Sequence, residues 1–131
     1  MFQQNDKEEE EDSEVCEIAT RNSWENHPMP TQRNQIAFDR TFSEAEFAKI
    51  KSGHIPAEME DRWFAFFEDG DLYFHRSWTG YCIFQVKLEK TNKGWRVKEA
   101  WVNQDESQYT SESLEKDIQM LGNVFEWSLG I

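Results

Sequence analysis

The sequence predicts an α+β fold: an antiparallel four- to five-stranded meander sheet, with a short N-terminal helix and a longer C-terminal helix packed on it. Three observations support this prediction. Asp69-Gly70 lies between two runs rich in aromatic residues, a helix-capping signal begins at Ser43, and apolar residues recur at helical spacing from about residue 112 to 129. Neighbouring strands followed by a helix that covers one sheet face are typical of the α+β class. A chain of 131 residues has room for one domain of ordinary size.

Residues 1–31 are expected to form a flexible acidic leader, and residues 32–131 a single α+β domain. Residues 1–26 hold nine acidic and two basic side chains, and so carry −7 of the total net charge of −12. A segment of like charge with few apolar side chains cannot bury enough surface to offset the entropy that ordering costs. An electrostatic docking arm is the alternative role for this leader.

The first helix is expected over residues 44–52, after a strand within residues 35–42. Ser43 suits the N-cap, and Glu46 follows three residues later, which is the spacing of a capping box. Gly53 then suits the C-terminal end of the helix, where a positive φ is common.

The strongest signal for strands is Asp69-Gly70, a dipeptide that suits a two-residue type I′ turn because both central residues need a positive φ. This turn fixes a register, which pairs Phe67 with Leu72, Phe66 with Tyr73, Ala65 with Phe74, Phe64 with His75, Trp63 with Arg76 and Arg62 with Ser77. Both faces of the hairpin are aromatic. The sheet is therefore either covered on both sides, or it exposes one aromatic face for binding.

Two further turns, at Thr79-Gly80 and around residues 92–94, predict strands over residues 81–89 and 95–103. The chain then forms a helix over about residues 112–129, with Thr110 or Ser111 as its N-cap. The apolar stripe expected to face the sheet consists of Leu114, Ile118, Leu121, Phe125 and Ser128, widened by Met120, Val124 and Trp127.

Composition argues against several classes of function. Cys16 and Cys82 do not form a disulfide framework, which indicates reduced thiols in a cytosolic protein. No secretory signal and no stretch near ~20 apolar residues is visible, so we expect a soluble, cytoplasmic protein with no membrane partner. Nucleic acid is not expected as a partner either, because binding to it needs clustered Lys and Arg. The oligomeric state is left open.

Neither a metal nor an organic cofactor is expected. His27, His54 and His75 are not spaced as metal ligands, and no cysteine lies beside a histidine at zinc-site spacing. Glycine-rich dinucleotide and phosphate loops, hydrolase elbows and kinase signatures are all missing from the sequence.

The densest group of functional side chains is the string His75-Arg76-Ser77-Trp78-Thr79-Gly80, called the 75–80 motif below. Arginine offers a planar fork for phosphate, tryptophan a stacking surface, serine and threonine hydroxyls, and histidine a group that titrates near neutral pH. Such a set suits a phosphorylated, heteroaromatic ligand such as a nucleotide. The structural alternative is that Arg76 pairs with Glu60 or Asp61, His75 is a hydrogen-bonded core residue, and Trp78 packs under a helix.

A second group, Glu60-Asp61-Arg62-Trp63, should lie at the same end of the sheet as the 75–80 motif if the hairpin has the register above. Acids, arginines, tryptophans and a histidine that converge at a sheet edge are typical of a binding pocket. They could also support acid–base chemistry, with Glu60 or Asp61 as the base and His75 as the acid.

From Met59 to Tyr81 the chain resembles a small bacterial domain of unknown function that carries a His-Arg-Ser-Trp-Thr-Gly motif and is associated with ADP-ribosylglycohydrolase-related proteins. The likeness covers roughly residues 36–103, and the 75–80 motif is its most specific part. It implies an accessory module for an ADP-ribose-like or other nucleotide ligand. It implies no catalytic residues, and the acidic metal-binding motifs of true ADP-ribosylglycohydrolases are missing here.

Two functions are therefore expected as alternatives. The first is binding, with or without hydrolysis, of a phosphorylated nucleotide or ADP-ribose-like ligand at the end of the sheet. Its ligand-binding residues would be Arg62, Trp63, His75, Arg76, Ser77, Trp78 and Thr79, and its catalytic candidates Glu60, Asp61 and His75. The second is a protein-interaction module of the immunity or inhibitor type. Its acidic surface would attract a basic protein partner, and an aromatic sheet face would form the contact.

Overall fold

The computed structural model describes residues 17–131. Residues 1–16 of the flexible leader expected over residues 1–31 lie outside this part of the chain. The elements in chain order are β2 (Arg33–Ile36), β3 (Thr41–Phe42), α1 (Glu44–Ser52), β4 (Trp63–Glu68), β5 (Asp71–Arg76), β6 (Cys82–Thr91), β7 (Gly94–Asn103), α2 (Leu114–Val124) and the π-helix η2 (Phe125–Leu129).

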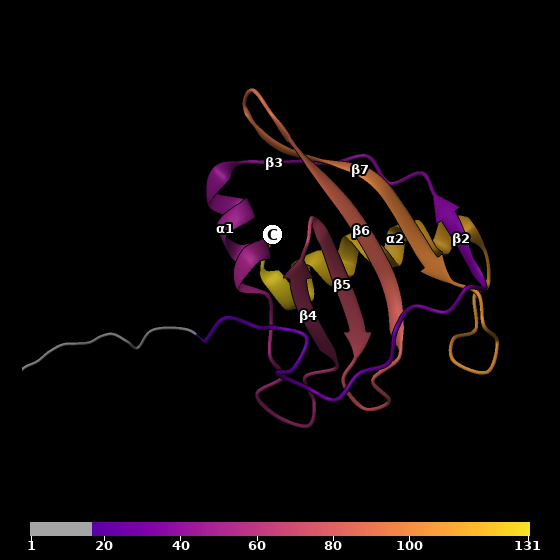
Figure 1. The fold of residues 1–131 in the computed structure, drawn as a ribbon. Coiled ribbons are helices and arrows are strands. Elements are labelled where there is room, and N and C mark those ends of the chain that lie inside the picture. Colours follow the sequence, from indigo (N-terminus) through magenta and orange to yellow (C-terminus); the bar gives the residue numbers. More distant parts are fainter. Residues whose placement is uncertain (1–16) are drawn as a thin grey trace, which may run out of the picture.

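The sheet has six strands in the order β2-β7-β6-β5-β4, with β3 paired to another part of β7 (Figure 1). Every pairing is antiparallel, so the predicted α+β fold is confirmed. The strand expected over residues 35–42 is divided into β2 and β3. Between them the chain leaves the sheet, and Phe38 stacks on Phe125 with ring centroids 5.7 Å apart.

The local signals of the first helix and the first hairpin are confirmed. The Ser43 side chain accepts from the Glu46 N–H while the Glu46 carboxylate accepts from the Ser43 N–H, which completes the capping box. Asp69 and Gly70 have φ values of 54° and 88°, as a type I′ turn requires. The paired positions of β4 and β5 are those predicted.

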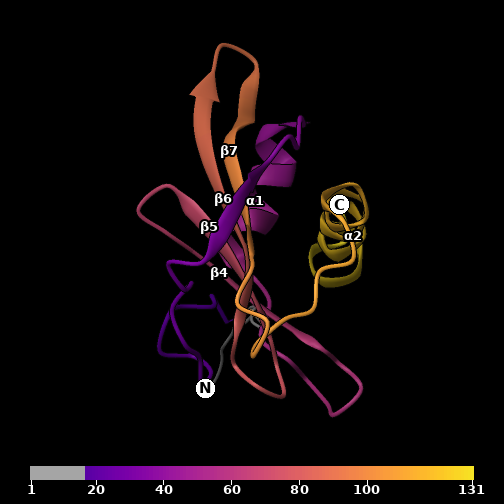
Figure 2. The same cartoon turned by 90° about the vertical axis from the view of Figure 1, so that its right-hand side faces the viewer.

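Both helices lie on the same side of the sheet (Figure 2). The main hydrophobic core fills the space between them and the sheet, where Phe74, Phe84 and Phe125 are fully buried. Ring contacts between aromatic side chains run through this core, and Phe74 meets Phe125 edge-on with centroids 5.1 Å apart.

The opposite side of β4 and β5 is covered as well, by the chain before residue 32. A smaller cluster of Ala19, Phe64 and Phe66 is buried there, with Trp24 packed against it. The Trp24 indole donates to the Ser77 carbonyl at 2.8 Å. Residues 17–31 thus belong to the packed part of the chain, although their composition places them in the expected leader. The reason is that a few specific contacts, rather than mean hydropathy, hold this segment on the sheet.

The outer edge of β4 is paired at one position with His54, two residues after the end of α1. His54 and Ala65 exchange two backbone hydrogen bonds, of 2.8 and 2.9 Å. Gly53 permits this approach, because its φ is +67° and a Cβ there would lie 2.4 Å from the Ala65 carbonyl oxygen.

The C-terminal helix differs from the prediction at both ends. Ser113, not Thr110 or Ser111, is the N-cap, because the Ser111 hydroxyl donates to the Asp117 carboxylate instead. From Phe125 the α-helix becomes a π-helix, whose wider turn changes which side chains face the sheet. Leu129 is buried as a result, while Trp127 is 60% exposed.

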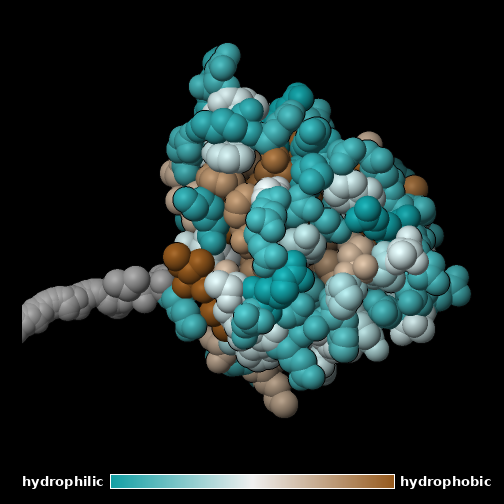
Figure 3. Space-filling model, viewed as in Figure 1, coloured by the Kyte–Doolittle hydropathy of each residue, from teal (hydrophilic) through white to brown (hydrophobic). Residues whose placement is uncertain are grey.

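Hydrophilic residues dominate the face seen in Figure 3, and apolar areas on it are small. No helix among residues 17–131 is long and apolar enough to cross a membrane.

Candidate functional site

Strand β5 divides the 75–80 motif between the two sides of the sheet. Successive side chains of a strand point to opposite faces. His75 lies among Phe64, Phe66 and Tyr73 on the face covered by residues 17–31. Arg76 lies on the face of the helices. The structure therefore does not bring the imidazole and this guanidinium into one site.

His75 is enclosed by protein, with 1% of its surface exposed. Its Nε2 lies 3.1 Å from the His27 carbonyl oxygen. Because a carbonyl can only accept, Nε2 carries the proton. Burial lowers the pKa of His75 to about 4, and this outweighs the hydrogen bond to His27, which acts in the opposite direction. His75 is thus neutral at neutral pH and has no open path to a ligand.

The other polar side chains of the 75–80 motif hold local structure. The Ser77 hydroxyl donates to the Asp61 carbonyl at 2.8 Å, and the Thr79 hydroxyl accepts from the Tyr81 N–H at 3.3 Å. The Trp78 indole donates to the Met59 carbonyl at 2.9 Å. Trp78 and Thr79 are the exposed residues of the motif.

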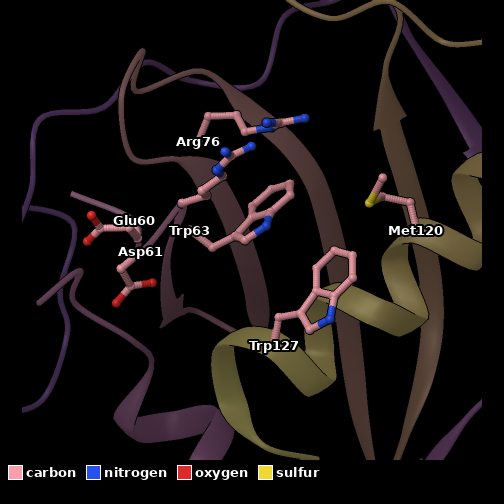
Figure 4. Close-up of a pocket in the computed structure, with 7 residues that line it drawn as sticks. Glu60, Asp61, Trp63, Arg76, Met120 and Trp127 are labelled. Atoms are coloured by element: carbon pink, nitrogen blue, oxygen red, sulfur yellow. The ribbon is translucent and has the colours of Figure 1, made fainter. Parts of the chain in front are cut away.

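A cleft between the sheet and the C-terminal helix is lined by Arg76 together with the predicted group Glu60-Asp61-Arg62-Trp63 (Figure 4). Its volume is about 510 Å³. Its walls come from the start of β4, the end of β5 and the helices α2 and η2, through Glu60, Asp61, Arg62, Trp63, Arg76, Met120 and Trp127.

Arg76 is the central cation of the cleft. Its Cζ lies 4.9 Å from the centroid of the Trp63 ring, a cation–π distance. Its buried Nε has no hydrogen-bond partner, and the guanidinium forms no ion pair with any residue from 17 to 131. Nε itself is buried, so an anion in the cleft would meet the terminal N–H groups of this half-buried side chain, which also carry the positive charge.

Two indoles border the cleft from different elements. Trp63 is buried in the sheet, with 6% of its surface exposed, whereas Trp127 projects from η2. In Figure 4 both rings and the Met120 side chain face the space beside Arg76. This combination of flat apolar surfaces and one cation can hold a planar ligand that carries a negative charge.

The carboxylates expected as catalytic groups are placed differently. Figure 4 shows that the carboxylates of Glu60 and Asp61 point away from the space between the two indoles. Asp61 accepts from His54 Nε2 at 2.6 Å and from the Ala57 N–H at 3.1 Å. The histidine partner of Asp61 is therefore His54, not His75, and the pair anchors the loop 56–62.

A buried polar network lies beside Arg76 on the helix side. The Tyr109 hydroxyl donates to the Asp117 carboxylate at 2.8 Å, and the Ser111 hydroxyl donates to the same carboxylate at 2.5 Å. Burial first, and then the bond to Asp117, raise the pKa of Tyr109 well above its usual range, while the charge of Arg76 acts the other way. The network fixes the start of α2 against the sheet end that holds Arg76.

Sequence reasoning did not place Met120, Trp127 or His54 in or beside the site. Met120 and Trp127 were assigned to the buried stripe of a continuous α-helix, and only the π-helix turns Trp127 outward. For His54 the usable signal was its position just after a helix stop and seven residues before Asp61.

No group of three or more His, Cys, Asp or Glu side chains that could hold a metal ion occurs within the described range 17–131. Comparison of the chain with known proteins finds no matching protein family, no matching curated protein and no matching solved structure.

Proposed function

We propose that the cleft between the sheet and the C-terminal helix binds a small phosphorylated nucleotide-type ligand. The observation that carries this proposal is the Arg76 guanidinium, held over Trp63 without an acidic partner among the described residues. Arg76 receives the phosphate, and Trp127 offers an exposed indole for stacking of the base. A volume of about 510 Å³ agrees with the ~300–1,000 Å³ usual for small-molecule pockets.

The binding residues proposed from the sequence are revised accordingly. Arg62 and Trp63 remain with Arg76, and Met120 and Trp127 are added. His75, Ser77, Trp78 and Thr79 are left out, because they do not line the cleft and their polar groups bond within the protein or lie on the other face. We assign no hydrolytic step, since the cleft lacks a histidine and Asp61 is held by His54. The resemblance to ADP-ribosylglycohydrolase-related proteins makes ADP-ribose one candidate ligand among several.

The alternative, a basic protein partner bound to an aromatic sheet face, finds less support. Phe64 and Phe66 are the aromatic residues that such a face would need, and both are buried under residues that precede β2.

Thermal unfolding in the presence of AMP, ADP, ADP-ribose, adenosine and inorganic phosphate tests the proposal. A ligand at 100 times its dissociation constant stabilises a protein by about 2.7 kcal/mol, which raises the melting temperature by several degrees. We expect a shift of the melting temperature with at least one nucleotide and a smaller shift with adenosine or phosphate alone. Adenosine lacks the phosphate that Arg76 binds, and phosphate lacks the base that stacks on Trp127.

Variants identify the site. Arg76→Gln and Trp127→Ala should remove the shift. Arg96→Gln, an exposed arginine of β7 that pairs with Glu89, should retain it and serves as the matched control. The proposal fails if no phosphorylated ligand produces a shift, or if Arg76→Gln leaves the shift unchanged.

A further inference from the structure

The cleft around Arg76 has a second cation, Arg62, an exposed residue that lies just before β4. The carbonyl of Arg62 accepts from the N–H of Ser77, the residue that follows Arg76, at 2.8 Å. Neither guanidinium forms an ion pair anywhere in the described part of the chain, although Glu60 and Asp61 line the same cleft. Two positive charges in one cleft repel each other, so an anion that contacts both of them is favoured.

Arg62 also connects the cleft with an indole outside it. Its Cζ lies 5.9 Å from the centroid of the Trp78 ring, a cation–π distance. Trp78 does not line the cleft but a separate recess of about 660 Å³. A phosphate bound to Arg62 would therefore bring whatever is attached to it within reach of Trp78.

Trp78 offers an aromatic surface whose hydrogen-bonding group is already used. Its Nε1 donates to the Met59 carbonyl at 2.9 Å, which holds the ring in place, while 69% of the residue is exposed. Contact through the ring remains, and aromatic side chains of this kind stack on any nucleic-acid base. The exposed carboxylate of Glu58 lines the same recess and repels a phosphate there. The recess thus suits a ring of a ligand better than a phosphate.

We propose that the ligand of the cleft is a dinucleotide in which a pyrophosphate joins two nucleosides. Arg76 and Arg62 each take one phosphate, one base stacks on Trp127, and the other base stacks on Trp78. The planar fork of a guanidinium matches a phosphate group, and each phosphate of such a pyrophosphate carries one negative charge. This inference rests on the proposed function of the cleft and narrows the class of its ligand.

Isothermal titration calorimetry of the full chain with AMP, ADP-ribose and diadenosine diphosphate tests the proposal. ADP-ribose adds a second phosphate and a ribose to AMP, and diadenosine diphosphate adds a second base to ADP-ribose. The last two ligands carry the same charge, so their comparison isolates the second base. We expect diadenosine diphosphate to bind about tenfold or more tightly than ADP-ribose, which is the order of affinity that one stacked base contributes.

Variants locate the contacts. Trp78→Ala should weaken binding of diadenosine diphosphate by about tenfold and binding of ADP-ribose much less. Trp78→Phe also removes the bond to the Met59 carbonyl but keeps a ring, and should retain most of the difference between the two ligands. Arg62→Gln should weaken binding of ADP-ribose more than binding of AMP, because AMP has no second phosphate. Arg96→Gln, which lies outside the cleft, is the control and should change no affinity by more than about twofold.

Two outcomes would overturn the proposal. One is an affinity for diadenosine diphosphate less than about threefold above that for ADP-ribose. The other is a difference between these ligands that Trp78→Ala leaves unchanged. In either case, binding of AMP or ADP-ribose that Arg76→Gln abolishes would still support the proposed function of the cleft. Lack of binding of all three ligands also overturns the dinucleotide, and the thermal unfolding experiment decides separately on the proposed function.

Discussion

His75 and Arg76 are consecutive residues of β5, yet the sheet separates their side chains completely. The imidazole is buried against Phe66 with ring centroids 5.6 Å apart, whereas the guanidinium lies over Trp63 on the other face. His75 therefore belongs to the packing beneath residues 17–31, whereas Arg76 is available to a ligand.

Stability should fall in mild acid because of His75. Its pKa of about 4 in the folded protein is below the usual value of 6.5, so the unfolded chain takes up the proton first. The contribution is complete above about pH 6.5 and is lost as pH falls toward about 4, up to about 3 kcal/mol in all. Urea unfolding between about pH 7 and about pH 4.5 measures this slope.

The variant His75→Gln should show a flatter dependence of stability on pH than the unsubstituted protein, whatever its stability at neutral pH. His27→Gln keeps the His27 carbonyl that His75 contacts, and should retain the slope. Identical slopes for His75→Gln and the unsubstituted protein would contradict the assignment.

The hydrogen bond between Asp61 and His54 should hold the loop 56–62 in place. Asp61→Ala removes the acceptor of His54 Nε2 and of the Ala57 N–H, and should cost about 1–3 kcal/mol of unfolding free energy. The neighbouring Glu60→Ala removes an exposed carboxylate and should change stability by less than about 0.5 kcal/mol. Chemical denaturation compares the two, and equal effects would show that the pair does not anchor the loop.

Residues 17–31 should be required for a stable sheet. A chain that begins at residue 32 uncovers Phe64, Phe66 and His75, and should be less stable by at least about 3 kcal/mol than a chain that begins at residue 17. It should also bind an apolar dye more strongly. Equal melting temperatures of the two truncated chains would show that the segment contributes little.

Two glycines give a matched test of how tightly the N-terminal segment meets the turn after β5. Gly80 has φ +78°, and a Cβ there would lie 2.9 Å from the Glu25 carbonyl oxygen. Gly70 has φ +88°, but a Cβ there would meet nothing within 4 Å. Gly70→Ala should therefore cost about 1–2 kcal/mol from the backbone alone, and Gly80→Ala about 1–3 kcal/mol more. Thermal unfolding that gives the same loss for both would contradict the close approach.

Local chemistry made part of the fold predictable. The Asp69-Gly70 turn dictates the register of β4 and β5 because only a type I′ turn fits two residues with positive φ. The capping box at Ser43 determines the start of α1 in the same way. Both signals act within a few residues, so no knowledge of the rest of the fold is needed.

The site was predicted less well, for two physical reasons. The alternation of side chains along β5 already places His75 and Arg76 on opposite faces of the sheet. The sequence prediction nevertheless grouped them into one site, because they are adjacent in the chain. Trp127 could not be found from periodicity, because a π-helix breaks the 3.6-residue period that places a side chain on one face. The role of Trp24 was not predicted, because it depends on a hydrogen bond to Ser77, which is far away in the chain.

The backbone exchange between His54 and Ala65 has a consequence for how copies of the chain meet. An uncovered border strand can recruit a strand from another molecule and extend the sheet without limit. At the β4 border, a strand that pairs along the whole of β4 must displace both of these hydrogen bonds. At the opposite border, β2 offers only four residues. Both borders thus present a short or interrupted edge, which opposes strand-by-strand aggregation.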